Sequence, residues 1–253
     1  MINQLVQSAA KLSLISGVTL LSSLTPVAKT LALSTEEVVK TLKIPVFVVA
    51  DDKGKPLVGQ FNTKDKKDKK AFIYIFINRN DAKTFYNNLK KKSPDVIKNS
   101  QVVMQPLGSI YQTELSQSGK PNSILFLYIP EKQQVEQAKK VSKDAGHPYK
   151  GGVPLFVLTS VKNKGYLTIK QKDHEVIPLF LTYDKMKQLL SKVKKEKPEL
   201  AGDLKSDVIP LEGFMAKLKN SNDPNLTKFI LVPSEESIKA VREAEAKFKG
   251  APK

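Results

Sequence analysis

The chain carries one sequence pattern twice, about 104 residues apart, and this repeat limits its possible folds more than any other feature. The β-branched run at 44–49 matches the run at 153–158. The stretch 76–91, which passes from aromatic through polar to lysine-rich residues, matches 180–195. The repeat therefore predicts two copies of one unit, related by a pseudo-two-fold axis.

Hydrophobic periodicity predicts the elements within each unit. Short apolar runs rich in β-branched residues are typical of strands, and they occur at 44–50, 71–77, 101–107 and 123–129, and again at 153–158, 206–211 and 228–232. The turn residues at 51–56 lead into Leu57 and Val58, which indicates a hairpin. The polar, lysine-rich run 62–70 predicts an exposed loop.

Two helices in each unit follow from spacing. Apolar side chains at i, i+3, i+4 and i+7 predict a helix capped by Asn80 or Asp81, and its copy capped by Asp184. Further helices are predicted at 131–143 and 234–248. The lysines at the ends of the first pair suit the negative end of a helix dipole.

The expected fold class is α/β, with helices packed on mixed sheets and the element order β-β-α-β-β-α in each repeat. The repeats span about 40–143 and 150–248, joined by the glycine-containing segment 144–152. Units of about 100 residues with sheet edges to cover often share one core. Residues 33–253 are therefore expected to form a single domain.

The N-terminus reads as a leader. Lys11 precedes a mostly apolar run at 12–21, and small residues precede a cleavage point after Ala32. The run is too short and too rich in Ser and Thr to span a bilayer. We therefore expect 1–32 to be a signal peptide and the remainder to be exported, to the periplasm or to a thylakoid lumen; the alternative is a disordered or amphipathic tail.

The net charge of +17, which becomes +15 once Lys11 and Lys29 leave with the predicted leader, favours anionic partners. Nucleic acid and anionic membrane surfaces are both in this class. Nucleic-acid sites usually mix arginine and aromatic side chains with lysine, yet the arginines are only Arg79 and Arg242, and tryptophan is absent. Solvated lysine-rich helix faces explain the charge better, and no nucleic-acid partner is expected.

Residues for catalysis are scarce. Cysteine is absent, and His147 and His174 are the only histidines. Neither histidine has a nucleophile motif nearby, and no metal-ligand or phosphate-loop spacing occurs. The sequence predicts no cofactor, no metal and no enzyme, although an active site made only of acidic residues remains open.

The order of several loose motifs resembles one family along 35–248. These motifs are 42–47, the segment 76–92 ending before Pro94, 106–111, 128–130, 152–156 and 177–180. Together they are similar to the twenty-two-kilodalton Tic component family, which includes chloroplast import subunits and cyanobacterial relatives. The leader is of the bacterial type and favours the cyanobacterial branch.

This resemblance implies a soluble, chaperone-like factor in protein translocation or outer-membrane protein biogenesis. Its partners would be unfolded or precursor polypeptides, β-barrel assembly or translocon components, and a membrane to which it associates peripherally. A basic protein that binds nucleic acid or an anionic membrane surface is the alternative.

Corresponding positions in the two copies also indicate candidate client-binding residues. The segments 106–111 and 210–215 each follow a strand, contain a glycine and then offer two large apolar residues. If these connections are exposed, Ile110, Tyr111, Phe214 and Met215 form paired apolar grooves. The alternative is that the four side chains simply cover the sheet.

Overall fold

The structure, a computed structural model, describes residues 18–20, 33–62, 69–120, 122–171 and 174–249. Most of the predicted leader and the middle of the lysine-rich run 62–70 therefore lie outside the described residues. No helix within the described ranges is long and apolar enough to cross a membrane.

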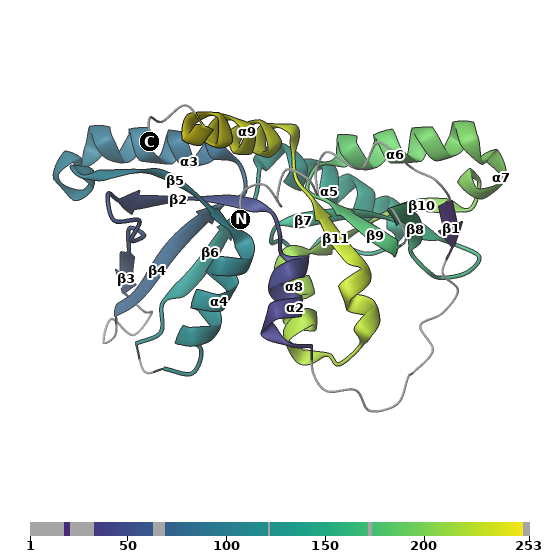
Figure 1. Cartoon of the computed structure of the whole chain (residues 1–253), viewed down its shortest axis with the longest axis horizontal. Helices are drawn as coiled ribbons and strands as arrows, with labels where there is room; N and C mark the ends of the chain where they lie inside the picture. Colours follow the sequence, from purple (N-terminus) through teal and green to yellow (C-terminus); the bar gives the residue numbers. More distant parts are fainter. Residues whose placement is uncertain (1–17, 21–32, 63–68, 121, 172–173, 250–253) are drawn as a thin grey trace.

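The chain folds into two sheets that lie side by side (Figure 1). The first, here the N-terminal sheet, has the order β3-β4-β2-β5, with β6 parallel to β4. Its strands are β2 (Pro45–Asp51), β3 (Gly59–Asn62), β4 (Lys69–Phe76), β5 (Ser100–Pro106) and β6 (Leu125–Ile129).

The second, here the C-terminal sheet, has the order β1-β8-β9-β7-β10, with β11 parallel to β9. Its strands are β1 (Val18–Leu20), β7 (Pro154–Ser160), β8 (Leu167–Gln171), β9 (His174–Phe180), β10 (Leu204–Pro210) and β11 (Phe229–Val232). Apart from β1, the two sheets have the same strand order. The expected α/β class with mixed sheets is therefore confirmed.

The register also corresponds between the sheets. Phe47 lies opposite Phe76 in one, and Phe156 lies opposite Phe180 in the other. The strands that begin at Pro45 and Pro154 pair with strands that end at proline. Proline is tolerated at these positions because the end of a strand need not donate a ladder hydrogen bond.

Six longer helices accompany the sheets: α3 (Arg79–Lys92), α4 (Leu107–Gln117) and α5 (Lys132–Ala145), then α6 (Tyr183–Glu196), α8 (Leu211–Asn220) and α9 (Glu235–Lys249). Shorter ones are α2 (Thr35–Thr41), α7 (Pro198–Ala201), η2 (Pro94–Ile97) and η3 (Pro224–Lys228). Helices α3, α9 and α6 cover one side of the molecule, and α2, α4 and α8 meet at the centre of the other (Figure 1).

The predicted order β-β-α-β-β-α is wrong, because each half has the order β-β-β-α-β-α-β-α apart from its short helices. The segments 106–111 and 210–215 are not exposed connections, because helices α4 and α8 begin directly after β5 and β10. The helix caps also differ from prediction. Asn78, not Asn80 or Asp81, caps α3 and accepts from the backbone N–H of Asn80 at 2.7 Å. Thr182 rather than Asp184 stands at the start of α6, without a side-chain cap.

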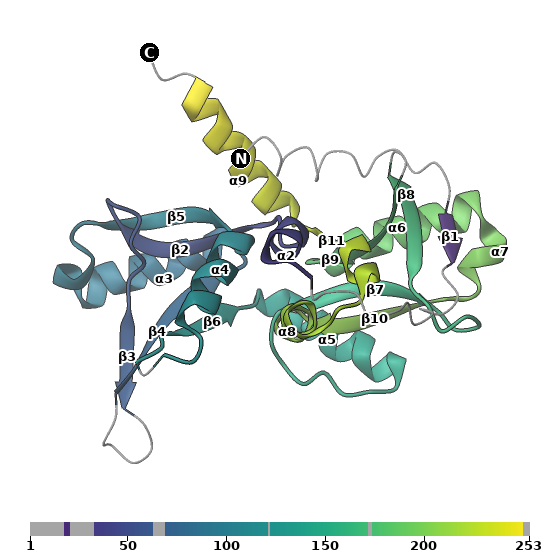
Figure 2. The same ribbon diagram turned by 60° about the horizontal axis from the view of Figure 1, so that its bottom comes forward.

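Helices α5 and α9 are exchanged between the two halves, and we call them the exchanged helices. Helix α5 follows β6 of the N-terminal sheet, yet Ala138 and Val141 pack with Phe156 and Phe180 of the C-terminal sheet. Helix α9 follows β11, yet Ala240 packs with Phe76 of the N-terminal sheet. In Figure 2 the far end of α9 extends away from the two sheets.

Each exchanged helix also caps a helix of the half that it joins. The Gln134 side chain of α5 accepts a hydrogen bond from the N–H of Tyr183, the first residue of α6, at 3.0 Å. Glu236 of α9 accepts from the N–H of Arg79, the first residue of α3, at 3.3 Å. The Arg79 guanidinium also pairs with Glu243 at 2.5 Å. These contacts satisfy backbone donors that a helix start leaves free.

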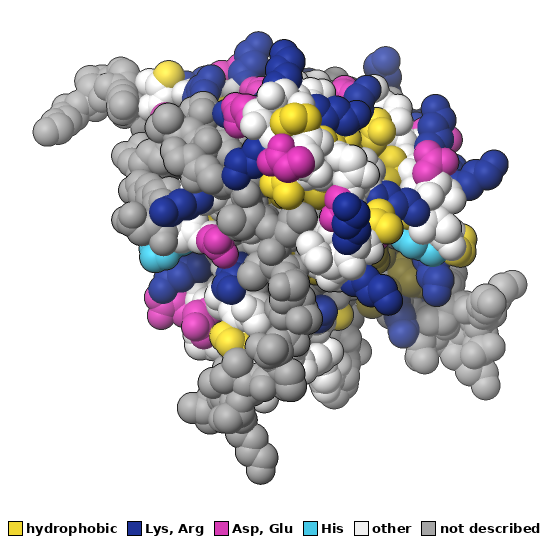
Figure 3. Space-filling view, turned by 90° about the vertical axis from the view of Figure 1, so that its right-hand side faces the viewer, with side chains coloured by type: hydrophobic (Ala, Val, Ile, Leu, Met, Phe, Trp, Pro, Cys, Tyr) yellow, Lys and Arg dark blue, Asp and Glu magenta, His cyan; other side chains and the backbone are white. Residues whose placement is uncertain are grey.

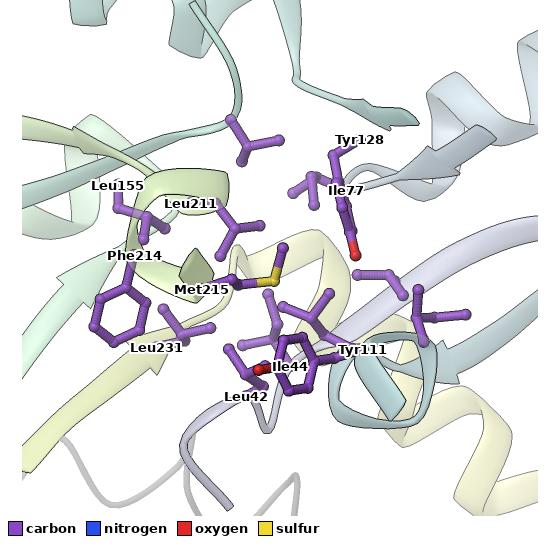
Figure 4. Packing of buried hydrophobic residues seen from close by; sticks show 14 of the residues in the cluster. Leu42, Ile44, Ile77, Tyr111, Tyr128, Leu155, Leu211, Phe214, Met215 and Leu231 are labelled. Carbon is purple, nitrogen blue, oxygen red and sulfur yellow. The ribbon is translucent and has the colours of Figure 1, made fainter. Parts of the chain in front are cut away.

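A central cluster of apolar side chains joins the two halves (Figure 4). It contains Leu42 after α2, Tyr111 of α4, Leu155 of β7 and Met215 of α8. Helix α2 approaches α4 closely, since a Cβ added at Gly108 would lie 3.0 Å from the Val39 carbonyl oxygen. Both sheets contribute to this cluster, whereas two further clusters, around Phe156 and around Phe76, each lie on one sheet.

Candidate functional site

An apolar hollow lies on the N-terminal sheet, and we call it the aromatic groove. It has a volume of about 290 Å³ and opens between β4, α3 and η2. Its lining contains no charged side chain and consists of Val49, Leu57, Val58, Gly59, Phe72, Tyr74, Phe76, Phe85, Leu89 and Val96.

The floor of the groove comes from the alternation of β4. Successive side chains of a strand point to opposite faces. Ile73 and Ile75 therefore point into the central cluster, whereas Phe72, Tyr74 and Phe76 line the groove.

The aromatic rings of the groove contact one another in a continuous row. Phe72 and Tyr74 have centroids 4.9 Å apart, and Tyr74 meets Phe85 of α3 edge-on at 5.3 Å. Phe61 of β3 extends the row, 5.9 Å from Phe72, and is 43% exposed. Such tilted and edge-on arrangements are the favoured ones for aromatic pairs. The rings therefore form a preorganised apolar surface that reaches solvent.

A glycine sets the position of the Phe72 ring. A Cβ added at Gly59 would lie 2.4 Å from the ring atom Cζ of Phe72. No side chain fits there unless the ring moves, so Gly59 allows Phe72 to lie across the adjacent strand.

Two large apolar side chains are exposed at the rim of the groove. Val58 is 40% exposed and Val96 is 58% exposed. Large apolar side chains that gather around a hollow are typical of a binding surface. The arrangement can take up apolar side chains of a partner.

The corresponding face of the C-terminal sheet is filled. Val176, Pro178 and Phe180 of β9 occupy the positions of Phe72, Tyr74 and Phe76, and all three are buried. Leu167 of β8 and Leu189 of α6 close the packing around them. The two sheets thus share a strand order but differ in this respect: one face is open and the other is core.

The four residues selected from the repeat lie elsewhere, in the central cluster; Figure 4 labels Tyr111, Phe214 and Met215 there. Ile110, Tyr111, Phe214 and Met215 are between 3% and 5% exposed. They come together because α4 and α8 turn their apolar sides toward the junction of the sheets. The expectation that they are exposed is therefore wrong, and the alternative that they cover the sheets matches their burial. A role in binding stays a prediction.

A cleft of about 330 Å³ lies between α4 and α8, where Tyr111 and Met215 form part of its wall. It is more polar than the aromatic groove. The Tyr128 hydroxyl donates to the Glu114 carboxylate at 2.8 Å, and burial, then Glu114, raises the Tyr128 pKa. Glu212 accepts from the N–H of Val153 at 3.0 Å. Each carboxylate is thus hydrogen-bonded within its own half, Glu114 to β6 and Glu212 to the start of β7.

Serine at Tyr111 or Met215 is expected to lower the free energy of unfolding by on the order of 3 kcal/mol, because each change leaves a cavity and buries a hydroxyl. Urea unfolding measures the loss. If neither substitution changed the urea unfolding curve, these side chains would not be needed for packing, and their assignment to the core would be wrong.

Residues for chemistry are sparse in the described part of the chain. It contains no group of three or more His, Asp or Glu side chains that could hold a metal ion. His147 pairs with Asp207 at 2.7 Å, at the junction of α5 and β10. At the end formed by the C-terminal half, lysine side chains lie among acidic ones (Figure 3).

Sequence reasoning missed the aromatic groove. The signal was present in the alternation Phe72, Tyr74, Phe76 beside Ile73 and Ile75, which indicates a strand with two apolar faces. Such a strand either packs against other elements on both faces or leaves one apolar face open to solvent.

Comparisons with known proteins agree on one family. The sequence model of the Tic22-like family matches residues 4–243. A solved structure named Anabaena Tic22 and assigned to protein transport has a TM-score of 0.70 and 27% identity, covering 87% of this chain and 99% of that one. Tic22 from Plasmodium falciparum has a TM-score of 0.63 at 21% identity, covering 83% of this chain and 98% of that one, which shows a shared fold.

A curated relative, the chloroplastic protein TIC 22-like of Arabidopsis thaliana, is 25% identical over 170 residues. These residues are 65% of this chain, and the match spans about half the length of the relative. The family predicted from the motif order is thereby confirmed: the chain belongs to the Tic22-like family, which is associated with protein transport.

Proposed function

We propose that this protein is a periplasmic, chaperone-like factor that holds apolar segments of client polypeptides in the aromatic groove. Clients would be unfolded precursors in transit, including precursors of outer-membrane β-barrels. The observation that carries the proposal is the groove itself: a row of contacting rings, an exposed apolar rim and a lining without charge.

The size and chemistry of the groove suit short, unspecific contacts. Its volume of about 290 Å³ is near the lower end of ligand pockets and accommodates a few side chains rather than a folded surface. An uncharged aromatic lining gains free energy from any apolar side chain that it buries. The lysine-rich surface beyond the groove would speed the encounter with acidic clients.

The groove also relates the internal repeat to the proposed function. We infer that the two halves descend from one duplicated unit, with one face kept open for clients and the corresponding face packed as core. The shared strand order and register support this inference.

Lysine at both Val58 and Val96 is expected to abolish suppression of client aggregation while leaving the thermal melt nearly unchanged. Both side chains are exposed at the rim, so folding loses little, but a bound apolar segment would then have to desolvate a charge. A loss of at least about tenfold in apparent affinity follows, equivalent to 1.4 kcal/mol. Light scattering of an unfolded β-barrel precursor measures suppression.

The matched control is Val161→Lys, the same change at a side chain that is 63% exposed and is not part of the groove lining. It should suppress aggregation as well as the parent chain. Equal suppression by the rim variant would show that clients bind elsewhere.

A further inference from the structure

The outer edge of the C-terminal sheet is completed by a segment from the far N-terminus. Strand β1 pairs antiparallel with β8, with Val18 opposite Ile169, Thr19 opposite Thr168 and Leu20 opposite Leu167. It lies at the outer end of that sheet in Figures 1 and 2. A short piece of chain, distant in sequence, thus adds one strand to an otherwise complete sheet.

The strand that receives it is rigidly held. On its other side β8 pairs with β9 from Ile169 to Gln171. Leu167, Thr168 and Ile169 are at most 2% exposed, and Leu167 and Ile169 belong to the core around Phe180. An edge of this kind presents a fixed row of backbone donors and acceptors to any extended chain.

The corresponding edge in the other half is not extended. Strand β3 pairs with β4, and no other strand in the described ranges pairs with it. The added strand is therefore a property of β8 rather than a requirement of the shared sheet order.

We propose that the outer edge of β8 is a strand-addition site for extended, uncharged apolar polypeptide segments, and that residues 18–20, which belong to the predicted leader, occupy it in the full-length chain until the leader is removed. Strand addition gains affinity from main-chain hydrogen bonds and tolerates many sequences. This tolerance suits a protein whose clients vary. The inference takes the class of partner from the proposed function, but its site is separate from the aromatic groove.

The occupant seen in the structure defines the chemistry of the partner. Val18-Thr19-Leu20 belongs to a stretch, 12–28, that contains no charged residue and is rich in Leu, Val, Ser and Thr. The site should therefore take other uncharged segments of this composition, such as the leader segments of unfolded precursors.

Self-occupation predicts competition. A tethered segment competes at an effective concentration on the order of millimolar. A free peptide at micromolar concentration should scarcely bind while residues 18–20 hold the edge. Releasing those residues should raise its apparent affinity at least tenfold.

The experiment uses the full chain and a fluorescein-labelled peptide with the sequence of residues 14–23. Thr19→Pro is designed to release the edge, because proline has no backbone N–H to donate to a ladder and is disfavoured inside a strand. Thr19→Cys with Thr168→Cys locks it: the two residues are direct partners, and opposite Cα atoms in antiparallel strands lie within disulfide range. The parent chain has no cysteine, so no native thiol competes for the introduced pair.

We expect the peptide to bind the Thr19→Pro chain at least tenfold more tightly than the parent, and the locked chain not at all until it is reduced. Thr19→Ala, which keeps the backbone N–H of β1, should behave like the parent. Thr19→Cys with Gln171→Cys, three residues along β8 from the matched partner, should not cross-link. A peptide N-methylated on alternate residues should lose binding, which separates strand addition from unspecific apolar contact.

Equal binding to the locked and released chains, or no cross-link in the matched pair, would overturn the inference. The rim variant with lysine at Val58 and Val96 should bind the peptide normally. If that variant still suppresses client aggregation, the aromatic groove is not the client site and the proposed function is wrong. The strand-addition site is tested separately, by the peptide measurements.

Discussion

Alanine in place of Phe180 is expected to lower the free energy of unfolding by about 3–5 kcal/mol, as is alanine in place of Phe76, because each change removes a buried ring from a packed core. Phe180 is 3% exposed and lies opposite Phe156, and Phe76 is 5% exposed and lies opposite Phe47. Urea unfolding of the two variants measures the loss.

Phe61→Ala provides the control, since this ring is 43% exposed and should cost less than about 1 kcal/mol. The two core variants should differ in binding. Phe76 lines the aromatic groove, whereas Phe180 is packed in the other half. A stable Phe180→Ala protein would contradict the packing described for the C-terminal sheet.

Aspartate at Ala138 is expected to unfold the C-terminal half, although this residue follows a strand of the N-terminal sheet. Ala138 is fully buried against the core that contains Phe156 and Phe180. A charge placed there has no partner in that core, and the expected cost, several kcal/mol, is comparable to the whole stability of many domains. Hydrogen exchange should show lost protection first in β7 and β9.

Lys140→Asp is the matched control, because it places the same side chain two residues along on the exposed side of α5. It should leave protection unchanged. Loss of protection confined to the N-terminal sheet in the Ala138→Asp variant would mean that α5 does not pack as an exchanged helix.

The sequence predicted most strands because their apolar runs are bounded by turn residues and proline. The run at 101–107 became β5, and the run at 123–129 became β6 with its start two residues later. Helices α5 and α9 were expected at 131–143 and 234–248, close to their observed bounds. Which half they would cover could not be predicted, since periodicity gives a helix an apolar face but does not name its partner.

Helices α4 and α8 were missed for a local reason. Each begins immediately after a strand that ends in proline, and each has a glycine within its first three residues, Gly108 or Gly213. Proline and glycine are typical of turns, so the pattern favoured a loop. Tertiary packing at the junction of the sheets outweighs this local preference.

Helix α2 was missed although its signal was in the sequence. Ser34 and Glu37 have the spacing of a capping box, and the structure shows both reciprocal hydrogen bonds. The same signal could not reveal that Val38 and Leu42 would reach the central cluster.

The exchange of α5 and α9 has a consequence for the order in which a newly made chain matures. The floor of the groove contains Phe76, whose packing is completed by Ala240 of α9, a helix that is synthesised after the strands of both sheets. Until α9 is made, the aromatic residues of the N-terminal half lack part of their packing. A nascent chain interrupted before 235 would carry the rings of the groove without the helix that supports them, so the proposed holding of a client would depend on the synthesis of residues 235–249.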